Sequence, residues 1–444
     1  MPTPEFHRLA EDHRDEIVAL ARALVRIDTT NTGRMPTGNE TAAAEFLVKA
    51  LAAEGIHAEI EGRVAERGNV FATLPGASGR TALLLASHTD VVPAGDETQW
   101  THPPFAGTVD DGYLHGRGAS DMKGTVAAQA IALILLHRMR VPLAHSVGFV
   151  CVADEEAGGA YGMGWVAKAR PERLQARYCV NEGGGPIVEV NGAKWCLLGV
   201  GEKGRFEVRA TFHGRGAHAA HPWQGDNALF QAARAIERLR SYEPERDTSG
   251  PIFPYLRRAI GPITPATVDH VIEGLTRTNP RLADHCRQVS RLLVTPTMIS
   301  GGVKSNSVPD LCRLTCDVRA LPQQRPDEIE QIVRGLLPGA DVEIDCTAVA
   351  NDSPADPEWV ALLSDVLSEA LGQEAQVVPT ISGGFNDSRF VRELGVPAYG
   401  FAPLHPESDP SRRRAHGPNE SVAIRDLVLE AAVYLGLAYR LAVG

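Results

Sequence analysis

Residues 81–88 read Thr-Ala-Leu-Leu-Leu-Ala-Ser-His, a short apolar run that ends in a polar side chain. A continuous run of this length is typical of a strand that other elements cover on both faces. Residues 146–152 and 176–180 are two more such runs, and residues 124–139 form an apolar helix between the first two strands. Strands that alternate with helices predict an α/β fold, with a mostly parallel sheet covered by helices.

Polar groups that could act in chemistry directly follow these three strands. His88 comes just past the first apolar run, and Glu182 just past the third. Glu155 and Glu156 follow the second run. In open α/β sheets, ligands bind at the carboxyl ends of the strands. Parallel strands would therefore bring these sequence-distant groups to one rim, which predicts a functional site there.

A chain of 444 residues is too long for one ordinary core, and its pattern changes after residue 200. Alternating apolar and polar residues, typical of half-exposed strands, recur with helices between them. These strands and helices are expected at 204–212, 311–318, 340–345, 228–239 and 327–337. We therefore predict a catalytic domain in two parts, 1–199 and 350–444, with an inserted α+β sandwich over 200–349.

Composition excludes several classes of partner. The net charge of -11 argues against nucleic acid, and the one dense basic run, Arg412-Arg413-Arg414, is too short for a nucleic-acid arm. The longest apolar run, 126–136, is too short to span a bilayer, and the first seven residues lack the pattern of a signal peptide. Seven scattered cysteines without a CxxC pair indicate free thiols, which predicts a cytoplasmic protein.

Metal-ligand residue types recur along the chain in a set that can hold two divalent ions. The set comprises His88, Asp121, Glu156, Glu182 and His416. The three carboxylates and a bridging hydroxide would neutralise two divalent cations, and such a pair lowers the pKa of its bound water. Of the adjacent Glu155 and Glu156, one is better placed as ligand and the other as general base. Asp90 lies on the same side of an extended backbone as His88 and can fix its tautomer.

These residues lie in motifs that resemble the dinuclear zinc hydrolases that include aminoacylase, carboxypeptidase G, acetylornithine deacetylase and succinyl-diaminopimelate desuccinylase. The matching motifs, which follow one another along nearly the whole chain, are 87–93, 100–105, 116–124, 154–156, 181–184 and His416. The resemblance implies that Asp121 bridges two metals, with His88 and Glu182 on one and Glu156 and His416 on the other. It assigns Glu155 as the general base, Asp90 as the residue that orients His88, and a cis peptide bond to Asp121-Met122.

The same resemblance extends to the inserted domain, which in that family is a lid that closes on substrate and commonly forms a dimer. His218 matches the histidine that stabilises the oxyanion, although His213 and His221 compete with it. Asn306, Arg319 and Gly384 match positions close to substrate; Arg319 could bind a carboxylate in bidentate fashion or form a structural salt bridge. Residues 240–295 depart from the compact family members and are expected to add helices, at 265–275 and 281–293.

The sequence predicts a metal-dependent hydrolase that cleaves an amide bond of an N-acyl amino acid or small peptide with a free carboxylate, through a metal-bridging hydroxide and a glutamate base. Zn²⁺ is the expected ion, and Co²⁺ or Mn²⁺ accept the same ligands. A dipeptidase or carboxypeptidase on unblocked peptides is the alternative. An aminopeptidase would need an acidic pocket beside the metals, whereas the candidate groups are Arg319 and Asn306. A non-catalytic binding protein should have lost ligands or the base, whereas the five candidate ligands and Glu155 are all present.

Overall fold

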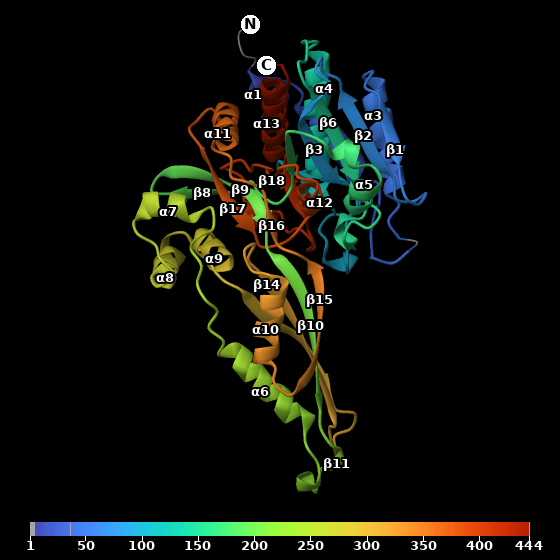
Figure 1. The fold of residues 1–444 in the computed structure, drawn as a ribbon. Coiled ribbons are helices and arrows are strands. Elements are labelled where there is room, and N and C mark those ends of the chain that lie inside the picture. Colours follow the sequence, from blue (N-terminus) through green and yellow to red (C-terminus); the bar gives the residue numbers. More distant parts are fainter. Residues whose placement is uncertain (1–4, 36, 444) are drawn as a thin grey trace. The chain divides into compact units, whose positions relative to one another are not determined.

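The computed structural model describes residues 5–35 and 37–443 (Figure 1). The chain folds into two compact units. The first comprises Met1–Val200, Ser353–Pro379 and Asn386–Gly444, and the second comprises Gly201–Asp352 and Thr380–Phe385. Residues 1–4, which form part of the segment that lacks a signal-peptide pattern, lie outside the described residues.

The first unit is built on a sheet whose central strands are parallel. These strands are, in spatial order, β6 (Ser146–Val152), β3 (Thr81–His88), β7 (Tyr178–Asn181) and β18 (Ala398–Gly400) (Figure 1). Antiparallel strands extend both edges: β2 (Asn69–Leu74) and β1 (Ala58–Glu61) beyond β6, and β9 (Ala193–Glu202) beyond β18. The predicted α/β class with its mostly parallel central sheet is confirmed.

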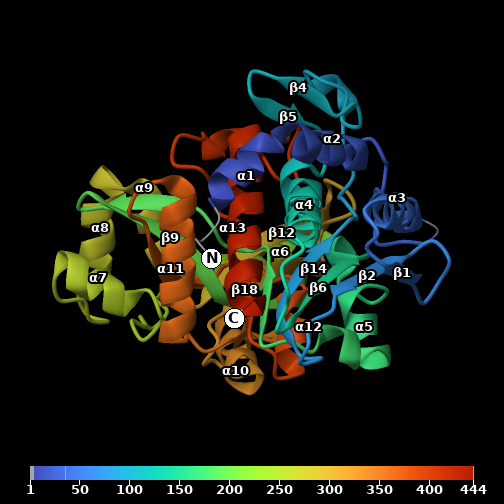
Figure 2. The same ribbon diagram turned by 90° about the horizontal axis from the view of Figure 1, so that it is seen from above.

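Helices cover this sheet, and two of them, α4 and α13, are apolar and lie at the centre of the unit. The helices of the first unit are α1 (Phe6–Asp12), α2 (Arg14–Val25), α3 (Glu40–Ala53), α4 (Gly124–Arg138), α5 (Met163–Ala169), α11 (Pro357–Leu371), α12 (Ser388–Glu393) and α13 (Ile424–Ala442). α4 and α13 pack side by side (Figure 2). The segment Ala119–Arg138 is long and apolar enough to cross a membrane, yet 94% of that stretch is buried inside the protein. It therefore serves as a core helix here.

Smaller strands complete the first unit. They are β4 (Thr108–Asp110), β5 (Tyr113–His115), β8 (Ile187–Val190), β17 (Gln376–Ser382) and β19 (Ser421–Ala423). β19, β5 and β4 form a separate three-stranded sheet in that order, while β8 and β17 pair with β9. The sequence analysis did not predict these strands. Four of them are runs of three or four residues, which carry too little alternation to be distinguished from loops, and β17 is longer but contains Pro379, which counts against a strand.

The second unit is an antiparallel sheet covered by helices. The strands of this unit are β10 (Gly204–His213), β11 (Ala217–His218), β12 (Leu293–Gly301), β13 (Ser307–Val308), β14 (Leu311–Ala320) and β15 (Ala340–Ala348). Four of them pair in the order β12-β14-β10-β15. The short strand β16 (Asn351–Asp352) pairs with the end of β9 instead. Alternate side chains of β10, such as Val208 and Phe212, point into a core that α6 (Ala228–Arg240) and α10 (Pro326–Leu336) cover (Figure 1).

The segment between α6 and β12 carries three helices rather than the two expected. They are α7 (Phe253–Ile260), α8 (Val268–Thr278) and α9 (Pro280–Val289). α9 begins one residue after Asn279, whose side chain caps the helix by accepting the backbone N–H of Leu282. The predicted helix at 281–293 was therefore too long at its C-terminal end, because Leu293 already belongs to β12.

Candidate metal centre

Strand register brings the predicted ligands to one rim of the first unit. His88 is the last residue of β3 and lies opposite Val152, the last residue of β6. Glu155 and Glu156 follow that strand in a short turn (Glu155–Ala157), and Glu182 follows the end of β7. Because β3, β6 and β7 are parallel, their carboxyl ends meet, as the sequence predicted.

Asp121 lies between two histidines, with each carboxylate oxygen facing a different one. His88 Nε2 is 3.2 Å from Asp121 Oδ1 and 3.5 Å from Glu182 Oε1. His416 Nε2 is 3.1 Å from Asp121 Oδ2 and 3.1 Å from Glu156 Oε2. This gives two groups of potential ligands that share one carboxylate: His88, Asp121 and Glu182, and Asp121, Glu156 and His416. The peptide bond Asp121-Met122 is cis, as the family resemblance implied.

The protonation of these side chains tests whether cations fit the cluster. Hydrogen bonds to Asp121 and Glu156 raise the pKa of His416 to about 10. Burial, followed by the charge of Asp121, raises the pKa of Glu182 to about 7. Protonated histidines thus supply the positive charge that the carboxylates require. Two divalent cations would supply it instead and displace the protons, so the residues present fit a dinuclear metal site.

Glu155 lies beside the candidate ligands: one of its carboxylate oxygens lies within 4.8 Å of a ring nitrogen of His88 and of a carboxylate oxygen of Glu156. Burial raises the pKa of Glu155 well above its ordinary range, and the charge of Glu182 adds to the effect. A carboxylate in such an environment holds a proton more strongly than one in water does. The side chain can therefore accept a proton at this rim and give it up again.

Asp90 is buried and holds the turn that carries both glutamates. Its Oδ1 accepts the backbone N–H of Glu155 at 3.0 Å, and its Oδ2 accepts that of Glu156 at 3.1 Å. His88 Nδ1 lies 3.4 Å from Asp90 Oδ1 and 3.1 Å from the backbone oxygen of the same residue. Asp90 thus contacts His88 and also positions the segment that carries the candidate base, Glu155.

Buried polar residues that the sequence analysis did not identify form hydrogen bonds around this turn. Asn31 donates from Nδ2 to Asp90 Oδ2 at 2.9 Å and to Asp154 Oδ1 at 3.1 Å. Arg67 pairs with Glu40 and donates to Asn31 Oδ1 at 3.1 Å. None of these residues lies in a recognisable motif. Only their burial in the fold, with exposed fractions of 4% or less, reveals their part in the site.

Glu420 holds Asp121 in place through the backbone. Its Oε1 accepts the backbone N–H of Ser120 at 2.9 Å and that of Asp121 at 3.1 Å, and its Oε2 accepts from Arg117 Nη1 at 2.5 Å. Glu420 lies four residues past His416, so its place near a ligand was a sequence signal that could have found it. It connects the loop of one ligand to the backbone of another.

The segment that contains Glu182 is fixed by a side-chain hydrogen bond to its backbone and by a close contact between two backbone segments. Asn386 donates from Nδ2 to the backbone oxygen of Glu182 at 2.9 Å. A β-carbon on Gly184 would lie 2.0 Å from the backbone oxygen of Gly400, so only glycine fits there. The Asn-Glu-Gly-Gly motif therefore needs its glycines because β18 passes directly beside this segment.

The remaining predicted site residues lie in the second unit, and the structure brings two of them together. His218 in β11 pairs with Ser307 in β13, next to Asn306, whose backbone oxygen accepts the N–H of Ala219 at 3.0 Å. Arg319 is bound to Asp317, with Nε 2.6 Å from Oδ1, which is the structural salt bridge left open above. A β-carbon on Gly384 would meet no atom within 4 Å. The roles of these residues toward substrate stay predictions.

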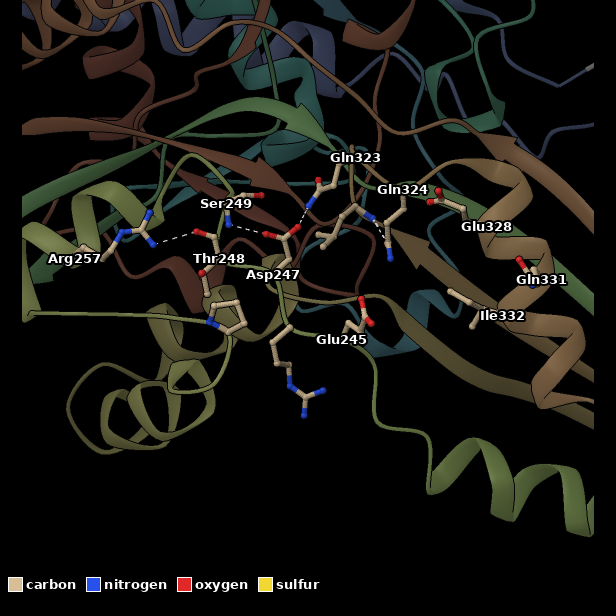
Figure 3. A pocket seen from close by; sticks show the side chains of 13 residues that line it. Glu245, Asp247, Thr248, Ser249, Arg257, Gln323, Gln324, Glu328, Gln331 and Ile332 are labelled. Atoms are coloured by element: carbon tan, nitrogen blue, oxygen red, sulfur yellow. Dashed lines mark hydrogen bonds between the residues drawn. The ribbon is translucent and has the colours of Figure 1, made fainter.

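A cavity of about 840 Å³ also lies within the second unit, where the added helices meet the segment 321–332 (Figure 3). Its polar groups bind one another. Asp247 accepts the backbone N–H of Ser249 at 2.6 Å and also the side chain of Gln323, while Arg257 donates to the backbone oxygen of Thr248 at 3.2 Å. These bonds hold the added helices to the sheet. None of the predicted site residues lines this cavity.

Comparison with known proteins decides the family. A model of peptidase family M20/M25/M40 matches residues 84–440. The chain belongs to this family. The chain is 28% identical over 431 residues to a succinyl-diaminopimelate desuccinylase of Methylorubrum extorquens. The alignment covers 94% of this chain and 96% of that protein. The chain is 30% identical over 370 residues to the enzyme of the same name from Paracoccus denitrificans, covering 80% and 84%.

Solved structures show the M20 fold directly. An M20 family metallo-carboxypeptidase from Sulfolobus solfataricus gives a TM-score of 0.71 at 19% identity, covering 96% of this chain and 99% of that one. A dinuclear metal binding peptidase of the M20 family from Bacillus subtilis gives 0.60 at 16% identity, covering 96% and 98%. The M20 chain is therefore a metal-dependent hydrolase of the metallopeptidase and deacylase type, as the motifs predicted.

Proposed function

We propose that the protein hydrolyses the amide bond of an N-acyl amino acid or small peptide that carries a free carboxylate. The observation that carries the proposal is the position of Asp121, whose two oxygens face His88 and His416 from opposite sides of a cluster that also contains Glu155. This arrangement supports hydrolysis with two metal ions and a neighbouring proton acceptor, which suits amide cleavage.

His88, Asp121 and Glu182 would hold one ion, and Asp121, Glu156 and His416 the other. When bound, the two ions would polarise the scissile carbonyl and lower the pKa of metal-bound water. Glu155 accepts the proton of the attacking water and later delivers it to the leaving amine. Asp90 fixes the Glu155 backbone, so the carboxylate stays beside the ligands during both transfers. The zinc identity of the ions belongs to the same proposal.

In the second unit, we propose that His218 stabilises the oxyanion and that Asn306 and Gly384 contact substrate, with this unit acting as the lid. Arg319 is the weakest member of this set, because Asp317 already neutralises its guanidinium. Arg319 could bind a substrate carboxylate only by breaking its ion pair with Asp317. The domain division 1–199, 200–349 and 350–444 and a cytoplasmic location are part of the proposal; all seven cysteines are free thiols, which supports the location.

A substrate panel tests the reaction. We expect the metal-loaded protein to hydrolyse N-acyl amino acids, including N-succinyl ones of the kind the named relatives process. Blocking the substrate carboxylate as an amide should lower kcat/KM about 10–100-fold, because hydrogen bonds to charged groups contribute about 1.5–3 kcal/mol. Release of amino acid, followed by chromatography, is the measurement.

The panel also includes unblocked dipeptides and aminoacyl amides as controls. Cleavage of unblocked dipeptides alone would replace the deacylase with the dipeptidase alternative. Absence of turnover on every substrate, with both ions of the candidate centre bound, would support a non-catalytic binding protein instead. Each outcome requires that bound metal be counted in the same preparation.

We further propose that the second unit mediates a homodimer. Its edge strand β12 exposes Met298 and Ile299, and the start of α6 exposes Leu229 and Phe230. The two segments meet, since a β-carbon on Gly301 of β12 would lie 2.9 Å from the Leu229 side chain. The apolar side chains exposed along this edge strand and at the start of α6 offer a surface to a second copy of the chain.

Charge on this face should separate the copies. We expect Phe230→Asp combined with Met298→Asp to shift the protein from dimer to monomer in sedimentation velocity, because the variant buries two unpaired carboxylates in any dimer. Ile60→Asp, which places the same charge on exposed β1, is the control and should leave the dimer intact. A wild-type protein that sediments as a monomer contradicts the proposal.

A further inference from the structure

A second convergence of metal-ligand side chains lies in the three-stranded sheet of the first unit. β4 and β5 form a tight hairpin that turns at Asp111 and Gly112, both with positive φ. Asp110 lies two residues from Thr108, which is directly opposite His115. Residues two apart on a strand share a face, so Asp110 and His115 point to the same side of the hairpin. Figure 2 shows β4 and β5 beside α2.

His102 reaches this face from the loop that precedes the hairpin. Its Nε2 lies 3.6 Å from Asp110 Oδ2, and its ring centroid is 4.6 Å from that of His115. One nitrogen from each histidine and one Asp110 oxygen all lie within 4.8 Å of one another. Ligands about 2 Å from a tetrahedral zinc ion are about 3.3 Å apart, so small side-chain rotations would close the set around one ion.

The condition of His115 points to a ligand. Its Nε2 is buried and has no hydrogen-bond partner, although buried ring nitrogens are normally satisfied. Burial and the nearby His102 lower the pKa of His115, which keeps the ring neutral, as metal coordination requires. The neighbouring cation, Arg412, is bound to Asp111 at 2.9 Å and stacks on Tyr113, so its charge is already balanced.

We propose that His102, Asp110 and His115 form a third metal site, which takes one divalent ion of the zinc type. Two imidazoles, one carboxylate and an open position reached from solvent suit zinc, and the Asp110 side chain, 64% exposed, provides the entry path. The site shares no residue with the two catalytic groups. It goes beyond the proposed hydrolase function and does not depend on it.

The ion would fasten the hairpin to the loop that carries His102. That loop is already bonded to the segment past His416, because Asn419 accepts the backbone N–H of Thr101 at 2.6 Å and donates to the backbone oxygen of Gln99 at 2.9 Å. An ion on His102 therefore restrains a loop that contacts the segment with a catalytic ligand. Its role is structural, and no proton transfer passes through it.

Metal counting tests the site on the full chain. After equilibrium dialysis against Zn²⁺, plasma emission spectrometry should find three ions per wild-type chain and two in the variant with both His102→Ala and His115→Ala. Asp110→Asn removes only the charge of an exposed side chain, and it should weaken the third ion without disturbing the hairpin. His57→Ala removes an exposed histidine elsewhere and should retain three ions.

The outcomes separate this site from the catalytic pair. The site is supported by three ions in the wild type and by the loss of one ion both in the double variant at His102 and His115 and in Asp110→Asn. This result does not depend on what the protein hydrolyses. A wild type that saturates at two ions overturns the proposal, as does a double variant that still binds three. Loss of the third ion in His57→Ala as well would show non-specific surface binding and overturn it too. Loss of ions in Glu156→Gln or His416→Ala, but in neither of the variants at His102, Asp110 and His115, also overturns the proposal.

Discussion

Glu155→Gln is expected to lower kcat by about 10²–10⁴-fold, the usual contribution of a positioned acid–base group. Glutamine keeps the size of the side chain and the backbone bond to Asp90 but cannot take a proton from water. Both metal ions should stay bound, because Glu155 is not required by either ligand group that shares Asp121. Turnover of an N-acyl amino acid and metal content per chain are measured on the same sample.

Glu172→Gln is the matched control, since it makes the same change at an exposed glutamate outside the site, and it should retain wild-type turnover. If Glu155→Gln retains more than about a tenth of the wild-type rate, the assignment of the base is wrong. If it loses metal as well as activity, Glu155 is a ligand rather than a base. The two results separate the roles of the adjacent glutamates.

Asp121→Asn is expected to abolish metal binding in at least one of the two positions and, with it, nearly all activity. The aspartate carries the charge that both ligand groups share, and its two oxygens face His88 and His416. An amide offers one weak oxygen and an N–H group that repels a cation. Metal content should fall below that of the wild type, and turnover should not recover with added Zn²⁺ because no shared carboxylate remains.

The control for this substitution is Asp365→Asn, which changes an exposed aspartate on α11 and should leave metal content and turnover unaltered. A melting curve monitored by circular dichroism checks that the Asp121 variant folds. A folded variant that binds the wild-type number of catalytic ions would contradict a bridging role for Asp121. The cis bond after this residue does not bear on the outcome.

That the candidate ligands lie together could be predicted, because each of them is tied to a local signal in the sequence. His88 and Glu182 follow apolar runs of strand length, and parallel strands bring their carboxyl ends together. Asp121 and His416 lie in motifs on which the family resemblance rests, and the family model matches residues 84–440, which include both. Such signals survive in the sequence because they involve residues near one another along the chain.

The polar framework under the cluster could not be predicted in the same way. Asn31 contacts Asp90 and Asp154, which are 59 and 123 residues further along the chain. Its neighbourhood contains no motif, and a buried asparagine looks like a surface one until the fold is known. The same holds for Arg67 and Glu40, which form an ion pair in the interior.

The sequence alone therefore determined the α/β class and the metal-dependent hydrolase class, and it predicted the candidate ligands, since these follow from short-range periodicity and from motifs. Tertiary structure decided which side chains hold the ligands in place and that Arg319 is bound to Asp317. It also brought His102 to the hairpin of Asp110 and His115. The physical reason is that burial and contact between distant segments set the partners of a polar group, and neither is encoded in its immediate neighbours.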